Sequence, residues 1–158
     1  MRYTIVISII LISIFSKISV AQDYQTSLGL RGGFSNGFTI KSFLSEKSAI
    51  EGILSTRWRG LNVVGLYEIH NQAFDEEGLK WYYGAGAHLS TWNGRNVNWV
   101  NDNNSYLAIG LDGIIGLEYT FSDYPFNIGI DWKPAINIIG HSSFVGDAGA
   151  LSIRYIID

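Results

Sequence analysis

Hydrophobic and polar residues alternate along most of the chain that follows residue 23. In residues 126–133, Phe-Asn-Ile-Gly-Ile-Asp-Trp-Lys, every second side chain is large and apolar. Successive side chains of a strand point to opposite faces, so such a segment forms a ribbon with one apolar and one polar face. The pattern recurs in eight segments, which we predict to be strands. They are residues 24–33, 37–44, 48–58, 61–71, 79–90, 105–121, 126–137 and 147–157.

The connections between these segments indicate how the strands are arranged. Eight antiparallel strands joined in chain order are expected to close into a barrel, because closure removes the unpaired edges of a sheet. The connection 91–104 is the longest, and its Asn93-Gly94 dipeptide favours a tight turn, so the fifth strand can continue outward and fold back. Long outer loops and short inner turns are typical of membrane barrels. We therefore predict an all-β fold, an eight-stranded antiparallel up-and-down transmembrane β-barrel.

The two faces of the predicted strands differ in charge. The apolar face, from Tyr24 in the first strand to Ile157 in the last, carries no charged residue and is expected to point outward. A charge at the bilayer midplane costs about 2–4 kcal/mol on the lipid face of a barrel, which would account for this absence. Phe43, Leu66 and Tyr82 fall on the other face, which is therefore mixed rather than purely polar.

The second face holds six cations and five anions besides His70 and His88. Because an ion in a narrow lumen loses much of its hydration, we expect these side chains to pair with one another in a structural network. Inward glycines such as Gly116 would make room for them, and an eight-stranded barrel is just wide enough to be filled by side chains. The predicted network consists of Arg31, Lys41, Arg57, Lys80, Lys133 and Arg154 with Glu51, Glu68, Asp112, Glu118 and Asp131.

A soluble barrel of the lipocalin or streptavidin kind is the alternative, with the apolar face inside and the charged face in water. Alternation alone does not exclude it. Composition argues against it, because 16% of the residues are charged, against roughly 25% in ordinary soluble domains. So many large apolar side chains would also overfill a small barrel.

Residues 1–21 are predicted to be a cleaved secretory signal, and residues 22–158 a single barrel domain. Arg2 precedes an apolar run, and Ser19 and Ala21 supply small residues before the expected cleavage site; an uncleaved anchor is the alternative. Without Arg2 and Lys17, 9 basic and 14 acidic residues remain, a net charge of −5 that argues against nucleic-acid binding. The absence of cysteine excludes a disulfide framework and a lipoprotein anchor.

Several segments along the predicted barrel carry a resemblance to a known class. They are Gly-Leu-Arg-Gly-Gly-Phe at 29–34, Lys-Ser-Phe-Leu at 41–44, Glu-Gly-Ile-Leu at 51–54, residues 110–119 and Asp-Trp-Lys-Pro at 131–134. The chain resembles the small outer-membrane β-barrel proteins of the Bacteroidota type, within the OmpA- and OmpX-like eight-stranded class. The resemblance implies location in the outer membrane of a Gram-negative bacterium, contact with its lipid, and insertion by the barrel assembly machinery. The insertion signal usually ends in an aromatic residue, whereas this chain ends in Asp158.

The sequence offers weak signals for catalysis or metal binding. His70 and His88, near Glu68, are interpreted as members of the lumen network, because a metal site needs three or four converging ligands. The last outer connection contains a possible nucleophilic set, but residues of one loop seldom reach triad geometry. This set is His141, Ser142, Ser143 and Asp147. We therefore predict no enzyme activity, catalytic residue, metal or cofactor.

The connection 91–104 is the best candidate for contact with a partner. Trp92, Arg95 and Trp99 lie among several asparagines, a mixture that suits an extracellular glycan or protein. The structural alternative is a strand extension in which Trp92 and Trp99 pair across a hairpin. The predicted function is thus a structural or adhesive outer-membrane barrel with a filled polar lumen. An outer-leaflet lipid-modifying enzyme and a narrow solute channel are the alternatives.

Overall fold

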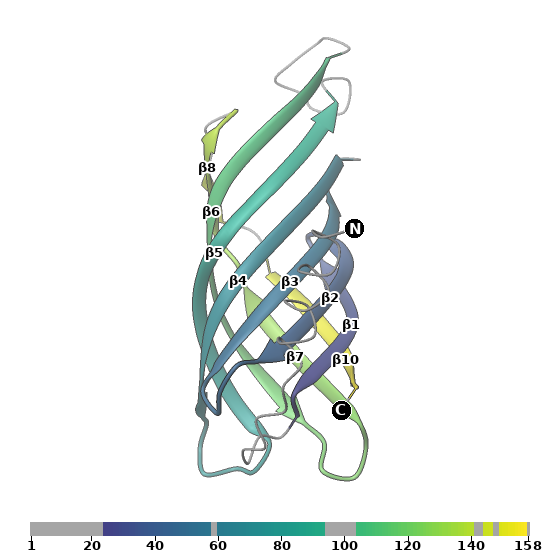
Figure 1. Cartoon of the computed structure of the whole chain (residues 1–158), viewed down its shortest axis with the longest axis vertical. Helices are drawn as coiled ribbons and strands as arrows, with labels where there is room; N and C mark the ends of the chain where they lie inside the picture. The colour runs from purple at the N-terminus through teal and green to yellow at the C-terminus, as the bar shows by residue number, and fades with distance from the viewer. Residues whose placement is uncertain (1–23, 58–59, 94–103, 141–143, 147–148, 158) are drawn as a thin grey trace, which may run out of the picture.

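The computed structural model describes residues 24–57, 60–93, 104–140, 144–146 and 149–157, which form ten strands (Figure 1). No helix among these residues is long and apolar enough to cross a membrane. The strands are β1 (Thr26–Gly33), β2 (Asn36–Phe43), β3 (Ser48–Arg57), β4 (Gly60–Gln72), β5 (Leu79–Asn93), β6 (Ser105–Thr120), β7 (Phe126–Trp132), β8 (Ala135–Ile139), β9 (Phe144–Val145) and β10 (Gly149–Ile156).

The strands form a closed antiparallel barrel. β1 to β6 pair in chain order, β7 pairs with β6 and β10, and β10 returns to β1. β8 continues the seventh barrel strand along the upper part of β6, where Leu111 pairs with Ile136. The predicted all-β fold of eight antiparallel barrel strands is confirmed. We call the end that carries the connections 44–47, 73–78 and 121–125 the lower end, as it is drawn in Figure 1.

The predicted seventh strand, 126–137, is interrupted. The break falls at Lys133 and Pro134, because proline has no N–H to donate to a sheet ladder. The Pro134 carbonyl still accepts a hydrogen bond from the Gly113 amide at 2.9 Å. Beyond the break, β8 pairs with the two-residue strand β9, which the sequence did not indicate. In the described residues the predicted eighth strand corresponds to β10, which begins at Gly149; residues 147 and 148 of the prediction lie outside the description.

Burial follows the predicted alternation. On β7 the exposed residues Phe126, Ile128, Ile130 and Trp132 alternate with three buried ones. One outward assignment is wrong: Tyr24 is 2% exposed. It precedes β1, and its ring packs edge-on against Phe43 inside the lower end, with the ring centroids 5.0 Å apart. The strand pattern does not govern Tyr24 because the residue lies before the strand begins.

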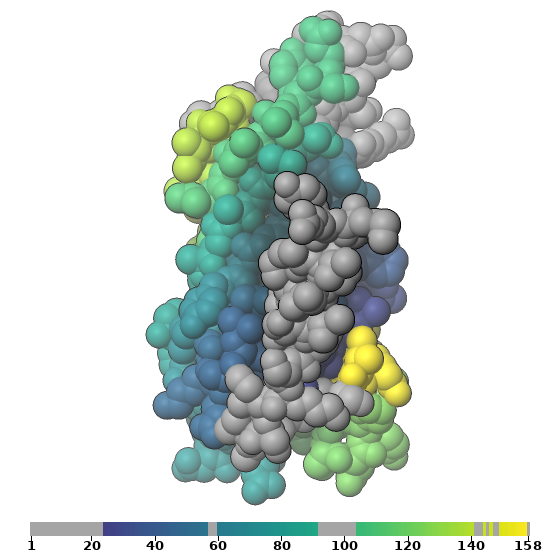
Figure 2. All heavy atoms as spheres, in the orientation of Figure 1, coloured from purple at the N-terminus to yellow at the C-terminus, as the bar shows by residue number. Residues whose placement is uncertain are grey.

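The wall of the barrel is uneven in height. β5 and β6 have 15 and 16 residues, whereas β1 and β10 have 8 each. The upper parts of β5 and β6, with β8 and β9, therefore stand above the strands on the other side (Figure 2). We call this part of the sheet the raised wall. The predicted outward extension of the fifth strand agrees with the observed end of β5 at Asn93.

Some predicted features lie outside the described residues. They are the signal peptide at 1–21, Arg95 and Trp99 of the contact loop, and His141, Ser142, Ser143 and Asp147. The side chains of Arg57 and Trp92 also fall outside the description.

Candidate functional site

Charged side chains gather inside the barrel in three groups. The lower cluster consists of Lys41, Glu51, Glu68, His70, Glu118 and Arg154. The central pair is Arg31 with Asp131, and the upper cluster is His88, Asp112, Lys133 and Asn137. All of these residues are buried. They come from β1, β2, β3, β4, β5, β6, β7, β8 and β10 and from Lys133 between β7 and β8, so the network crosses the whole lumen.

The lower cluster is organised around the ammonium group of Lys41. Its Nζ lies 2.8 Å from Glu68 Oε2, 3.1 Å from Glu118 Oε2 and 3.6 Å from Glu51 Oε2. The same Nζ lies 4.0 Å from the centroid of the Tyr82 ring, a cation–π distance. One cation thus joins carboxylates from three strands, which is the compensation that buried charges require.

Arg154 is the second permanent cation of the lower cluster. Its Nη2 donates to Glu51 Oε1 at 2.8 Å, and its Nη1 donates to Asn127 Oδ1 at 3.1 Å. Thr39 also donates its hydroxyl hydrogen to Glu51. Arg154 on β10 thus contacts residues of β3 and β7, and Thr39 adds β2 to the group. Arg154 and Glu51 are 103 residues apart in the chain.

His70 bridges two carboxylates of the lower cluster. Its Nε2 lies 3.0 Å from Glu68 Oε2, and its Nδ1 lies 3.3 Å from Glu118 Oε1. The imidazole stacks on the Tyr82 ring, with a centroid separation of 4.9 Å and an interplanar angle of 17°. Tyr24 donates its hydroxyl hydrogen to Glu118 Oε1 at 3.2 Å. The imidazole is therefore held both by acidic oxygens and by an aromatic ring.

The central pair joins β1, which carries Arg31, to β7, which carries Asp131. Arg31 binds Asp131 through both terminal guanidinium nitrogens, with Nη1 2.5 Å from Oδ2. Such bidentate contacts are among the stronger charged hydrogen bonds. Tyr82 donates its hydroxyl hydrogen to the same carboxylate at 3.4 Å. Tyr82 therefore contacts both the central pair and the lower cluster.

The upper cluster is centred on Asp112. One carboxylate oxygen lies 2.5 Å from His88 Nδ1, and the other accepts a hydrogen bond from Lys133. His88 Nε2 lies 2.8 Å from Asn137 Oδ1. Lys133 reaches Asp112 from the break between β7 and β8, so the interruption of the seventh strand positions a lumen cation.

The remaining predicted members of the network are placed differently. Lys80 is half-buried near the lower end, with its Nζ 5.3 Å from the centroid of the Phe43 ring. Arg57 lies at the end of β3, where the structure describes its backbone alone.

The lumen also contains an apolar cluster. The alternation places its members Leu66 and Tyr82 on the inner face, but the cluster is larger than these two residues. Its members are Ile53, Val64, Leu66, Tyr82 and Ile114.

Inward glycines make room for these long side chains. A Cβ added to Gly116 would lie 2.6 Å from Cζ of Tyr82, and one added to Gly110 would lie 2.5 Å from Cε1 of His88. Real Cβ atoms do not approach neighbours so closely, so a larger residue at either position would displace the ring. The glycines and the large lumen side chains are therefore complementary in shape.

The described residues contain no group of three or more acidic or histidine side chains arranged to hold a metal ion. In the lower cluster the ammonium of Lys41 lies where the acidic oxygens converge. The geometry therefore suits a network that fastens strands together inside the barrel.

Comparison with protein-family models, with curated proteins and with solved structures gives no match to this chain.

Proposed function

We propose that this protein is an integral outer-membrane β-barrel of a Gram-negative bacterium, with a structural or surface-interaction role and an interior filled by side chains. The observation that carries the proposal is the distribution of charge across the barrel wall. In the described strands the outward face has no charged side chain, while the ionic groups of the lower, central and upper sets point inward. A membrane barrel needs this arrangement, and a soluble lipocalin-like barrel needs the reverse.

The outward face is strongly apolar. Leu30, Ile130 and Leu151 are 57%, 55% and 63% exposed, and similar side chains cover the other barrel strands. Soluble monomers rarely expose contiguous apolar patches of more than a few hundred Å². In a bilayer the same surface is solvated by acyl chains. The closed ladder also leaves few unpaired backbone groups in the barrel wall, as hydrocarbon requires.

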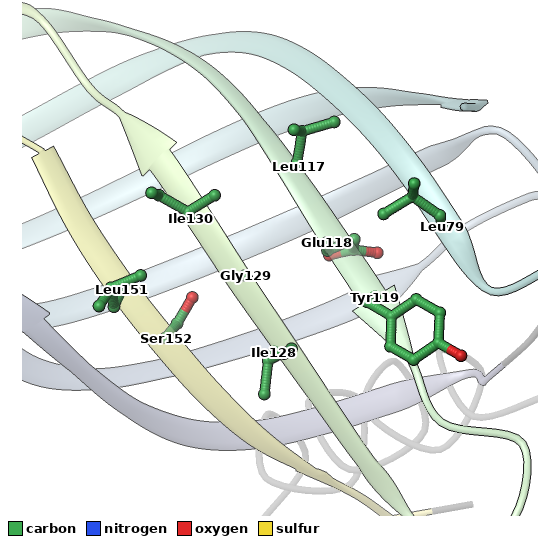
Figure 3. A pocket seen from close by; sticks show the side chains of 9 residues that line it. All are labelled: Leu79, Leu117, Glu118, Tyr119, Ile128, Gly129, Ile130, Leu151 and Ser152. Carbon is green, nitrogen blue, oxygen red and sulfur yellow. The ribbon is translucent and has the colours of Figure 1, made fainter. Parts of the chain in front are cut away.

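A shallow groove on this face lies over β6, β7 and β10 (Figure 3). Leu117 on β6, Ile130 on β7 and Leu151 on β10 line it, and the polar side chains of Glu118 and Ser152 are buried behind it. A groove of this composition suits an acyl chain of the surrounding lipid.

Aromatic rings collect on the outside of the lower end. Tyr119 packs edge-on against Phe121, and Phe126 against Tyr155, with centroids 5.0 and 5.5 Å apart. Trp81 on β5 continues the same rim. Aromatic side chains favour the interface between membrane and water, which supports an interfacial position for the lower end.

The raised wall supports the surface-interaction role. It carries the exposed side chains of Ile138 and Phe144, and it includes the end of β5 and the start of β6, which the predicted contact loop with Trp92, Arg95 and Trp99 connects in the sequence. With the turns of the lower end on the periplasmic side, this wall projects outside the cell. An extracellular glycan or protein remains the proposed partner, and the barrel assembly machinery and membrane lipid are the partners expected during and after insertion.

Fractionation of the expressing cells tests the membrane proposal. We expect the mature protein in the outer-membrane fraction, released by detergent and retained after washing with urea or alkaline buffer. Recovery from the soluble periplasm without detergent would overturn the proposal.

Affinity capture from intact cells tests the role of the loop. We expect the wild type to capture a partner that a Trp92→Ala/Trp99→Ala variant does not capture. Identical capture would remove the loop from the proposed interaction.

A further inference from the structure

A layer of apolar side chains lies at the lower end of the lumen. Phe43 is the last residue of β2, Ala49 is the second residue of β3, and Tyr24 precedes β1. These three residues form one buried cluster, and Ile156, the last residue of β10, packs against it. Three strands and the segment before β1 therefore meet in one group, which we call the lower layer.

Tyr24 is held in this layer by contacts of its side chain and of the neighbouring backbone. Its ring packs edge-on against Phe43, with the centroids 5.0 Å apart, and its hydroxyl donates to Glu118 Oε1 at 3.2 Å. The carbonyl of Gln25 accepts a hydrogen bond from the Phe43 amide at 2.8 Å. Because β1 begins at Thr26, Tyr24 lies outside the strand and is placed by these contacts.

The lower layer covers the lower cluster directly. The Phe43 ring lies 4.7 Å from the His70 ring, measured between centroids. The charged side chains of the lower cluster are all 0% exposed. On β6 and β7, Thr120 and Asn127 are also buried, and the Asn127 amide donates to the Thr120 hydroxyl at 3.0 Å. Exclusion of water strengthens the ion pairs inside the barrel, because the local dielectric is low.

We infer that Tyr24 is a plug for the lower mouth: the segment before β1 turns inward, and the Tyr24 ring closes the lower cluster off from water on this side. Because the plug lies outside the ladder of the barrel, its removal should open the mouth without undoing the strand pairing. The inference concerns the interior alone and holds whatever solvates the outside of the barrel. A solute channel through the barrel would have to displace this ring.

Cysteine accessibility tests the inference, because the chain has no cysteine of its own. Ala49→Cys places a thiol in the lower layer of the folded, detergent-solubilised protein, and iodoacetamide is the probe. We expect alkylation to be slower by about tenfold or more than in the urea-unfolded chain, because the layer must open first. Lys47→Cys, in the exposed turn 44–47, gives the rate of an accessible thiol. Alkylation of Ala49→Cys at that rate with Tyr24 intact would overturn the inference.

Replacement of Tyr24 tests whether its ring is the plug. In Tyr24→Ala/Ala49→Cys we expect alkylation to rise by about tenfold or more, while the heat-modifiable gel shift shows a folded barrel. Tyr24→Phe keeps the ring and removes the hydrogen bond to Glu118, so the thiol should stay protected. The matched control is Tyr124→Ala, which removes an exposed ring from the turn 121–125 and should leave the thiol protected. Unchanged protection in Tyr24→Ala, exposure in Tyr24→Phe, or loss of the folded barrel in Tyr24→Ala would each overturn the inference.

Discussion

At the residue scale, the side chain of Tyr82 connects the lower cluster with the central pair. Its ring stacks on His70 and faces the ammonium of Lys41, and its hydroxyl hydrogen is donated to Asp131. The ring fits because residue 116 on the neighbouring strand, β6, is glycine. The alternation predicts that both residues point inward. The large ring and the glycine pack against each other because the register places Tyr82 opposite Gly116.

Enlarging this glycine should therefore destabilise the barrel. In Gly116→Ala the new methyl group would lie 2.7 Å from the Tyr82 hydroxyl oxygen and from the Ile130 carbonyl oxygen. Overpacking of this kind costs about 1–3 kcal/mol, which should lower the urea midpoint measured by the heat-modifiable gel shift of the folded barrel. Gly65→Ala is the control, because nothing lies within 4 Å of its added Cβ. Equal midpoints for the two variants would contradict the assigned packing.

The central pair gives a second prediction at this scale. Asp131→Asn leaves the Arg31 guanidinium buried without its partner charge, which should destabilise the barrel by about 3–5 kcal/mol. Replacing both members, in Arg31→Met/Asp131→Leu, should restore much of this loss, because an apolar pair has no charge to desolvate. A double-mutant cycle on unfolding free energies measures the coupling. Additive single effects would show that the two groups do not act as a pair.

At the element scale, the turn between β4 and β5 contains a local conflict. Phe74 and Asp75 both have positive φ values, 55° and 51°, and the Glu76 amide donates to the Ala73 carbonyl at 3.3 Å. This is the backbone of a type I′ turn, which favours Asn-Gly and disfavours a bulky residue such as phenylalanine. The Phe74 side chain is also 88% exposed, so little packing within the described chain compensates for the strain.

Correcting the turn should stabilise the protein. A Phe74→Asn/Asp75→Gly variant should gain about 1–2 kcal/mol, because both residues then tolerate the left-handed conformation. Urea unfolding at neutral pH measures the gain. A Phe74→Ala/Asp75→Ala variant removes the same side chains without relieving the backbone, and it should show little of this gain. Similar stabilisation of both variants would assign the effect to side-chain exposure instead.

In the seventh strand the alternation predicts one continuous strand where the structure has a break between β7 and β8. The alternation continues through Asp131-Trp132-Lys133, so periodicity alone predicts one strand as far as residue 137. Pro134 is the visible signal of the break, but proline is also tolerated on strand edges and at bulges. The consequence of the break is visible only in the assembled barrel, where Lys133 between β7 and β8 donates a hydrogen bond to Asp112 on β6.

At the scale of the whole molecule, the uncharged outer face leads to a prediction about depth in the membrane. Ile115 lies on the outside of β6 within the part paired to β7, and Phe121 lies just beyond the lower end of β6. In lipid vesicles, Ile115→Arg should cost about 2–4 kcal/mol and Phe121→Arg about 0–1 kcal/mol, since the penalty falls towards the interface. Unfolding free energies of the two variants, each compared with the alanine substitution at the same site, measure the difference. Equal costs would contradict the proposed placement of the bilayer.

The sequence by itself determined which residues face in, which face out, and how many strands the barrel has. Alternation has a period of two, and a strand converts that period directly into two faces, so local information suffices. The tertiary structure decided which inward charges meet, as in Arg31 with Asp131, 100 residues apart, or the three carboxylates around Lys41. It also decided that Tyr24 turns inward. These contacts depend on register, stagger and closure of the ladder, which bring distant strands to the same level of the lumen and have no local signal in the chain.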